Sequence, residues 1–362
     1  MSLFRIARGR DIFDIMAPMK KSEGVLYRKY RPQEFKDVIG QDHIVKVLEG
    51  AIELNNISHA YLFSGTRGTG KTSLARILSR AIGTTPNDLV EMDAASQTSV
   101  DDIRALNESV FTLPYESKFK VYIIDEAHML SKSAWNALLK TLEEPPTYVV
   151  FILATTEIEK VPETVISRCQ TFTFKSPNLS ILKDFALGIA KKEGAKLDPA
   201  AAELVALLGD GSFRDAHGIL EKVLSSTKDK VITREEVEVV TGAPKSELVR
   251  DILESVVEKN LEKGLKAVGK AGEQNADMKL FAKLILERMR FLFLLRLKSG
   301  MDDYIGQQIS EDDLKFLKEL AAKAGPDLTS DVLVRFIEAY ENSGRTSIPE
   351  LALELAIAES IS

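Results

Sequence analysis

Residues 61–78 read YLFSGTRGTGKTSLARIL, and this stretch decides the class of fold. Its first residues are apolar and typical of a buried β-strand, and the segment from Thr72 onward has the composition of a helix. Between them, residues 65–72 fit the pattern G-x-x-x-x-G-K-[ST], whose glycines permit a tight loop with backbone N–H groups that surround phosphate. We therefore predict a phosphate-binding loop (P-loop) between a strand and the positive end of a helix.

The loop predicts a nucleotide site with magnesium. Lys71 would reach the β- and γ-phosphates, and the hydroxyl of Thr72 would hold Mg²⁺. The alternative is a glycine-rich turn that binds nothing, which the strand and the helix around the loop disfavour. The residues of the loop predicted to contact nucleotide are Gly65, Thr66, Arg67, Gly68, Thr69, Gly70, Lys71, Thr72 and Ser73.

Short apolar runs alternate with helical patterns on both sides of the loop. Besides the strand before the loop, the runs are LVEMD (89–93), KVYIIDE (120–126), YVVFILATT (148–156) and QTFTF (170–174). Continuous apolar strands separated by helices are typical of a parallel sheet that helices cover on both faces. The sequence therefore predicts an α/β domain.

Two acids follow the third of these runs. Asp125 and Glu126 would reach the carboxyl edge of the sheet, where open α/β folds bind their ligands. We expect Asp125 to support the metal and Glu126 to polarise the attacking water. Solvated acids that merely end a strand are the alternative. We expect His128, which follows them, to pack against or cap the next helix.

Further polar residues lie at positions where they could complete this site. Thr155 and Thr156 end a buried strand and either could orient water, or they could be ordinary strand-end threonines. Arg168, at the far edge of the sheet, cannot fold back onto its own P-loop but could reach the nucleotide of a neighbouring subunit; its alternative is a surface salt bridge. Arg214 could contact the γ-phosphate of its own chain, or pair with a nearby aspartate (Asp210 or Asp215).

Composition excludes several classes of protein. The 48 basic and 54 acidic side chains leave a formal net charge of −6, which argues against a globally basic nucleic-acid binder. The single cysteine, Cys169, rules out an intrachain disulfide framework and a cysteine-cluster zinc site, and it suits a reducing cytoplasm. We expect Cys169 to be partly buried and non-catalytic. The most apolar window, 284–297, is too short and too charged for a membrane span and predicts a buried helix.

Strand patterns stop around residues 176–178, and we expect the chain beyond to be helical throughout. Asp198 followed by proline, and the capping box at residues 233–236, predict helix starts. The predicted domains are a disordered leader or start-site artefact (1–26), the α/β domain (27–177), a helical lid (178–243) and a helical collar (244–362).

In this order, the motifs closely resemble the DNA polymerase III gamma/tau clamp-loader subunits of bacteria, which are AAA+ ATPases. The resemblance covers about residues 27–216. It rests on the segments LYRKYRPQEFKDVIGQDHI (26–44), HAYLFSGTRGTGKTSLAR (59–76), EMDAAS (91–96), KVYIIDEAHMLSKSAWNALLKTLEEPP (120–146), FILATTEIEKVPETVISRCQTF (151–172) and GSFRDA (211–216).

The resemblance implies roles for the matching positions. Lys71 and Thr72 would be the P-loop pair and Asp125 and Glu126 the metal and water pair, with ATP and Mg²⁺ as ligands. The resemblance also implies roles for six further residues: Val38 and Ile39 in the adenine pocket, Thr155/Thr156 as first sensor, Arg168 as arginine finger in trans, and Arg214 as second sensor.

The implied function is that of an ATPase motor in the cytoplasm, without a polymerase site of its own, that opens a sliding clamp and loads it on primer–template DNA. Its partners would be further copies of itself, delta- and delta-prime-like subunits, the clamp and DNA. The chain departs from the family in three respects. It lacks the usual four-cysteine module, so we predict no zinc. Gln97 and Ser99 are neutral where relatives are often basic. As a third departure, we expect no long C-terminal extension of the tau type after the collar.

Two other functions are compatible with parts of the sequence. An AAA+ motor of DNA repair or recombination, of the branch-migration type, would share the P-loop but typically carries a winged DNA-binding domain, and no such β-hairpin pattern follows residue 244. A non-hydrolysing scaffold of the clamp loader would share the fold, but the intact Lys71 and Glu126 argue against it.

Overall fold

The computed structural model describes residues 25–96, 100–226, 231–298, 300–326 and 328–361. The predicted leader, apart from its last two residues, lies outside the described residues, as do Gln97 and Ser99.

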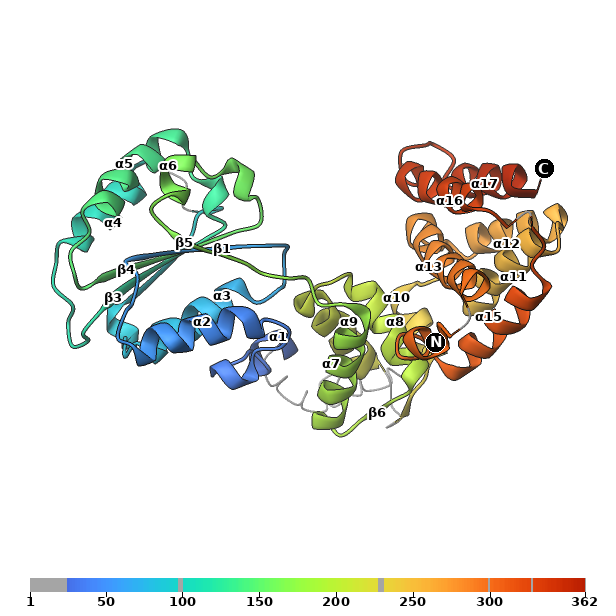
Figure 1. Cartoon of the computed structure of the whole chain (residues 1–362), viewed down its shortest axis with the longest axis horizontal. Helices are drawn as coiled ribbons and strands as arrows, with labels where there is room; N and C mark the ends of the chain where they lie inside the picture. The colour runs from blue at the N-terminus through green and yellow to red at the C-terminus, as the bar shows by residue number, and fades with distance from the viewer. Residues whose placement is uncertain (1–24, 97–99, 227–230, 299, 327, 362) are drawn as a thin grey trace, which may run out of the picture.

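A parallel sheet of five strands in the order β2-β3-β4-β1-β5 forms the first part of the molecule (Figure 1). Every predicted strand is present to within two residues at either end. Because β1 lies between β4 and β5, the strand that leads into the P-loop has a neighbour on both sides. The strands are β1 (Ala60–Ser64), β2 (Leu89–Asp93), β3 (Lys120–Asp125), β4 (Val149–Thr155) and β5 (Gln170–Thr173).

Helices cover both faces of this sheet, as the apolar strands predict (Figure 1). Alternate residues of β1 separate the two cores: Tyr61 and Phe63 pack with α2 and α3, whereas Leu62 packs with α4, α5 and α6 on the other face. The single tryptophan, Trp135, belongs to the second core and is 3% exposed. The helices are α2 (Asp42–Glu53), α3 (Lys71–Ala81), α4 (Val100–Val110), α5 (Lys132–Glu143) and α6 (Glu163–Ile166), with α1 (Leu26–Lys29) before them.

The chain after the sheet is mostly, but not entirely, helical. Residues Lys196–Leu197 (β6) and Val231–Ile232 (β7) form a short parallel pair, so the expectation of helices throughout is wrong at this point. The predicted capping box is confirmed, because the side chains of Thr233 and Glu236 each accept from the other's backbone N–H. The helices are α7 (Leu179–Lys192), α8 (Pro199–Gly209), α9 (Phe213–Ser226) and α10 (Arg234–Thr241).

The remaining helices pack around α13, which contains the apolar window 284–297. Its residues Phe281, Ile285 and Met289 are fully buried, so the predicted buried helix is confirmed. None of the helices in the described ranges is long and apolar enough to cross a bilayer. The helices are α11 (Ser246–Val257), α12 (Leu261–Glu273), α13 (Met278–Leu297), α14 (Asp302–Gly306), α15 (Glu311–Lys323), α16 (Ser330–Asn342) and α17 (Leu351–Ile361).

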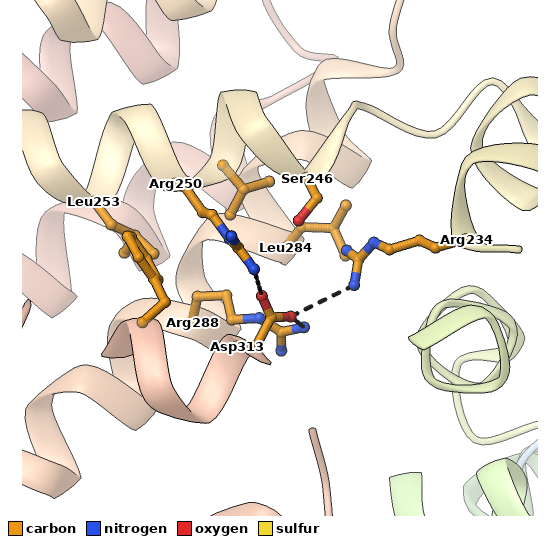
Figure 2. A pocket seen from close by; sticks show the side chains of 9 residues that line it. Arg234, Ser246, Arg250, Leu253, Leu284, Arg288 and Asp313 are labelled. Atoms are coloured by element: carbon orange, nitrogen blue, oxygen red, sulfur yellow. Dashed lines mark hydrogen bonds and ion pairs between the residues drawn. The ribbon is translucent and has the colours of Figure 1, made fainter. Parts of the chain in front are cut away.

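A buried ion cluster joins α8 and α10 to α11, α13 and α15. Figure 2 shows its members Arg234, Arg250, Arg288 and Asp313. Asp313 accepts from Arg250 at 2.6 Å and from Arg288 at 3.0 Å, and Arg234 lies 3.5 Å away. Arg288 also pairs with Glu203, which is fully buried. Burial alone would raise the pKa of Asp313, but the surrounding guanidinium groups, Arg288 above all, lower it overall. The cluster thus connects residues on both sides of the boundary predicted at 243/244, and one hydrophobic core also runs from α7 to α17.

Candidate nucleotide-binding site

A cleft of about 860 Å³ opens where the P-loop meets the start of α3. This volume falls in the range of roughly 300–1,000 Å³ that is usual for ligand sites. Besides the loop, the residues before α2, the carboxyl ends of β2 and β3, α7 and the start of α9 contribute to it. Its lining residues include Tyr30, Val38, Ile39, Lys71, Thr72, Asp125, Glu126, Phe185, Arg214 and His217.

Glycines of the P-loop are required by its geometry. Gly68 has φ +75°, and a Cβ at this position would lie 1.9 Å from Oγ of Ser212. Gly65 has φ +144°, and its Cβ would lie 2.7 Å from the carbonyl oxygen of Phe174. The backbone N–H of Phe213 donates to the carbonyl of Gly68 at 3.1 Å, which seats the first turn of α9 on the loop. The first turn of α9 can therefore contact the P-loop because Gly68 has no side chain.

Lys71 spans the loop from the first turn of α3. It is 6% exposed, and its Nζ donates to the carbonyls of Gly65 at 2.7 Å and Thr66 at 2.9 Å. Burial lowers the pKa of Lys71, against the opposing effect of the carboxylates of Glu126 and Asp125. The ammonium group is thus held among backbone oxygens at the place where phosphate oxygens would replace them.

The predicted metal pair is brought together by the sheet. Thr72 Oγ1 donates to Asp125 Oδ2 at 2.6 Å, although 53 residues separate them. The other oxygen, Oδ1, accepts from the backbone N–H of Glu126 at 3.0 Å. Glu126 itself has φ +48°, an uncommon conformation for a residue with a side chain. Asp125 is thereby oriented by two hydrogen bonds at the carboxyl end of β3.

The two threonines at the end of β4 have different surroundings. Thr156 Oγ1 donates to Glu126 Oε2 at 3.2 Å, so Thr156 is the one that contacts the predicted water-activating acid. Thr155 is fully buried; its Oγ1 accepts from the N–H of Glu157 at 3.0 Å and lies 3.2 Å from His128 Nδ1. The sequence left the choice between them open.

His128 does not cap α5, so that part of the expectation is wrong. Its Nε2 lies 3.2 Å from a carboxylate oxygen of Glu157, and its Nδ1 faces Thr155. The cap of α5 is Ser131, whose side chain accepts from Ala134. The reason is the short 3₁₀ helix Ala127–Met129, which separates His128 from α5.

Arg214 lines the cleft beside the P-loop. Its alternative, an ion pair with Asp210 or Asp215, is not formed: Asp210 pairs with Lys283 at 2.5 Å, and no carboxylate in the described ranges lies within 4 Å of Arg214. A second hollow adjoins the first, and Arg214 and Arg67 line both. The second hollow, of about 780 Å³, is lined by Tyr27, Arg28, Arg31, Gln33, Arg67, Arg76 and Arg214. Arginines thus gather at the phosphate end of the site.

Arg168 lies away from this cleft. It follows α6 and precedes β5, the edge strand of the sheet. Its Nη2 lies 2.7 Å from Glu143, and its Nη1 donates to the carbonyl of Thr164 at 2.6 Å. The next residue, Cys169, packs against the core of α4, α5 and α6, and burial raises the pKa of its thiol to about 12. A thiol with this pKa is a poor nucleophile, in agreement with the predicted bystander role.

An aromatic group on the wall of the cleft was not predicted. Its members are Tyr30, Phe185 and His217, with the ring centroids of Phe185 and His217 4.6 Å apart. His217 stands three residues after Arg214, so helical spacing could have placed the two on one face. Nothing in the sequence indicates Phe185, because it comes from a different helix.

Comparison with known proteins identifies the family. The subunit gamma of DNA polymerase III from Buchnera aphidicola is 34% identical over 335 residues, which are 86% of this chain and 91% of that protein. This chain belongs to the DNA polymerase III subunit gamma/tau family. The tau subunit of Bacillus subtilis is 34% identical over 355 residues, and that of Escherichia coli 36% over 323 residues. The chain spans 62% and 50% of these two tau subunits.

Two further comparisons concern parts of the chain or its fold. A family model described as DNA polymerase III, delta subunit, matches residues 83–178. The solved structure of the RuvB Holliday junction branch migration motor of Thermotoga maritima superposes with a TM-score of 0.51 at 23% identity, over 66% of this chain and 85% of that one. At this identity the likeness shows a shared fold, which agrees with the predicted AAA+ class.

Proposed function

We propose that this gamma/tau family member is the ATPase motor subunit of a bacterial replicative clamp loader. The observation that carries the proposal is the 2.6 Å contact between Thr72 and Asp125, beside the buried ammonium of Lys71 in the cleft. A hydroxyl from the P-loop helix and a carboxylate from a neighbouring strand are the two protein groups that P-loop NTPases use to hold nucleotide-bound metal.

The residues present suit Mg²⁺. Thr72 and Asp125 offer oxygen ligands, which this cation prefers, and it commonly takes its remaining ligands from substrate phosphates and water. When bound with ATP, Mg²⁺ neutralises charge on the β- and γ-phosphates. The hydrogen bond between the two side chains holds both potential metal-ligand oxygens, Oγ1 of Thr72 and Oδ2 of Asp125, next to each other in the cleft.

Hydrolysis would depend on Glu126. Its carboxylate, held by Thr156, would orient the attacking water and accept its proton. Lys71 would exchange the carbonyls of Gly65 and Thr66 for phosphate oxygens. Arg214 would balance the charge of the γ-phosphate from the start of α9, and this contact would couple ATP binding to the position of the lid.

Arg168 would act on the nucleotide of a neighbouring subunit. In the single chain its guanidinium pairs with Glu143 and lies outside the cleft, which agrees with supply in trans. We therefore propose a ring of several copies, with delta- and delta-prime-like subunits, held together by the helices of the collar (244–362). ATP binding would favour the state that opens the sliding clamp, and primer–template DNA would trigger hydrolysis and release.

The test is ATP hydrolysis by the reconstituted assembly with and without clamp and primed DNA. Clamp and DNA together should stimulate turnover, and R168A should lower it by roughly 10³-fold or more while each isolated chain still binds ATP. An ATP turnover rate that clamp and primed DNA leave unchanged, or ATP turnover that is accompanied by branch migration, would support the recombination-motor alternative. Absence of ATP binding would support the scaffold alternative.

A further inference from the structure

His217 occupies a specific position along the wall of the cleft. The helix α9 meets the P-loop at Phe213, and Arg214 follows at the phosphate end. His217 lines the same cleft three residues further on, which is about 4.5 Å along the helix axis at roughly 1.5 Å per residue. A nucleotide with its phosphates at the P-loop would therefore extend its nucleoside along α9 towards His217. This reasoning rests on the proposed nucleotide-binding function of the cleft.

The imidazole of His217 is fixed by its neighbours. The ring of Phe185 meets it edge to face, with centroids 4.6 Å apart, and the ring of Tyr30 is stacked at 6.4 Å. Its Nδ1 lies 3.0 Å from the backbone carbonyl oxygen of Phe213. A carbonyl oxygen can only accept a hydrogen bond, so Nδ1 carries the proton and Nε2 is left as an acceptor. Burial lowers the pKa of His217 to about 4, which keeps this neutral form at physiological pH.

The acceptor has no partner in the described part of the protein. His217 is 5% exposed, and its Nε2 is buried without a hydrogen bond. Buried polar atoms are satisfied in the great majority of cases, by protein, water or ligand, and leaving one unpaired is unfavourable. An acceptor at this place selects for a ligand that presents an N–H donor.

We propose that His217 is a base-reading residue, whose Nε2 accepts a hydrogen bond from the exocyclic amine of a 6-aminopurine. Adenine carries that donor at position 6. Hypoxanthine and guanine carry a carbonyl oxygen at position 6, whose lone pairs would repel the lone pair of Nε2. A site built to pair with a donor rejects the analogue that lacks it, because its own polar group then stays unpaired.

The experiment compares binding of ATP and inosine triphosphate, which present an amine and an oxygen at position 6, to the full chain by calorimetry. The wild type should bind ATP about tenfold or more tightly than inosine triphosphate. H217F keeps an aromatic ring but removes the acceptor, so it should weaken ATP binding and bring the ratio of the two affinities towards one. H217Q, which restores an acceptor oxygen, should recover part of the preference. F185L is the matched control: it disturbs the same ring contact and should change both affinities by a similar factor.

Nitrogen NMR of the histidine side chains adds a second measurement, which would not change if His217 only packed against the nucleotide. The chain has four histidines, and the His217 signals can be assigned by their loss in H217F. ATP, but not inosine triphosphate, should shift the Nε2 resonance towards that of a hydrogen-bonded nitrogen.

An unchanged preference for ATP in folded H217F would overturn the proposal. If H217F does not fold, H217L and H217Q decide the question by the same ratio. A wild type that binds both nucleotides equally would overturn the base-reading role while leaving nucleotide binding intact. A wild-type chain that binds neither ATP nor inosine triphosphate would overturn both the proposed function and the base-reading role of His217.

Discussion

Replacing Arg288 by methionine should destabilise the helical part of the chain strongly. Arg288 bridges Glu203 and Asp313, whose side chains are 0% and 5% exposed. Without Arg288, Asp313 keeps Arg250 and Arg234, but among the described residues Glu203 keeps only the backbone N–H of Ser310 at 2.9 Å. Leaving one charge of a buried pair uncompensated costs about 3–5 kcal/mol of unfolding free energy. We therefore expect R288M to lower the midpoint of thermal unfolding by roughly 10 °C.

R250M is the matched control. The side chain of Arg250 is 39% exposed, so solvent screens its pairing with Asp313, and Asp313 keeps two other guanidinium partners. Including the loss of its stacking over Phe316, R250M should cost about 1–2 kcal/mol. The double variant E203Q/R288M should recover much of the loss, because the orphaned charge is then absent.

Urea unfolding separates the two parts of the molecule. Far-UV circular dichroism follows all helices, whereas fluorescence of Trp135, buried in α5 against the sheet, follows the α/β part alone. R288M should shift mainly the dichroism transition. Equal losses in R288M and R250M would refute this account of the cluster.

Three further outcomes are expected. E126Q should bind ATP normally but lower its turnover by about 10²-fold or more, because the general base is lost; phosphate release measured beside equilibrium ATP binding checks this. G68A should weaken ATP binding, since its Cβ would lie 1.9 Å from Ser212 Oγ at a φ of +75°, whereas G218A, with open space around it, should leave binding unchanged; calorimetric titration compares the two. Asp88 accepts backbone N–H groups from residues 115–117, which lower its pKa despite the opposing effect of burial, so its stabilising contribution is full above about pH 4 and disappears as pH falls. D88N should therefore show a smaller loss of stability between pH 5 and pH 3 than the wild type in acid titrations followed by circular dichroism.

Local features of the sequence predicted most of the fold. The strand β1, the glycines and the start of α3 form one continuous segment, so their pattern could be read without knowledge of any distant residue. The capping box at Thr233 is equally local, and it is formed as predicted. The expected capping role of His128 was wrong, because its partners lie about 30 residues further along the chain: Thr155 at the end of β4 and Glu157 just after it.

The sequence by itself determined the strands, the P-loop and the nature of the acids, because continuous apolar runs and glycines that permit unusual φ angles are properties of neighbouring residues in the chain. Only the tertiary structure decided which threonine contacts Glu126, which residues Arg168 contacts, and that the ion cluster around Arg288 and Asp313 joins five helices. It also decided that His217, whose Nε2 is buried without a hydrogen bond to any described residue, is among the residues that line the cleft. These features depend on contacts between residues far apart in the chain, and a sequence pattern carries no information on the distance between such residues until the sheet order and helix packing are known.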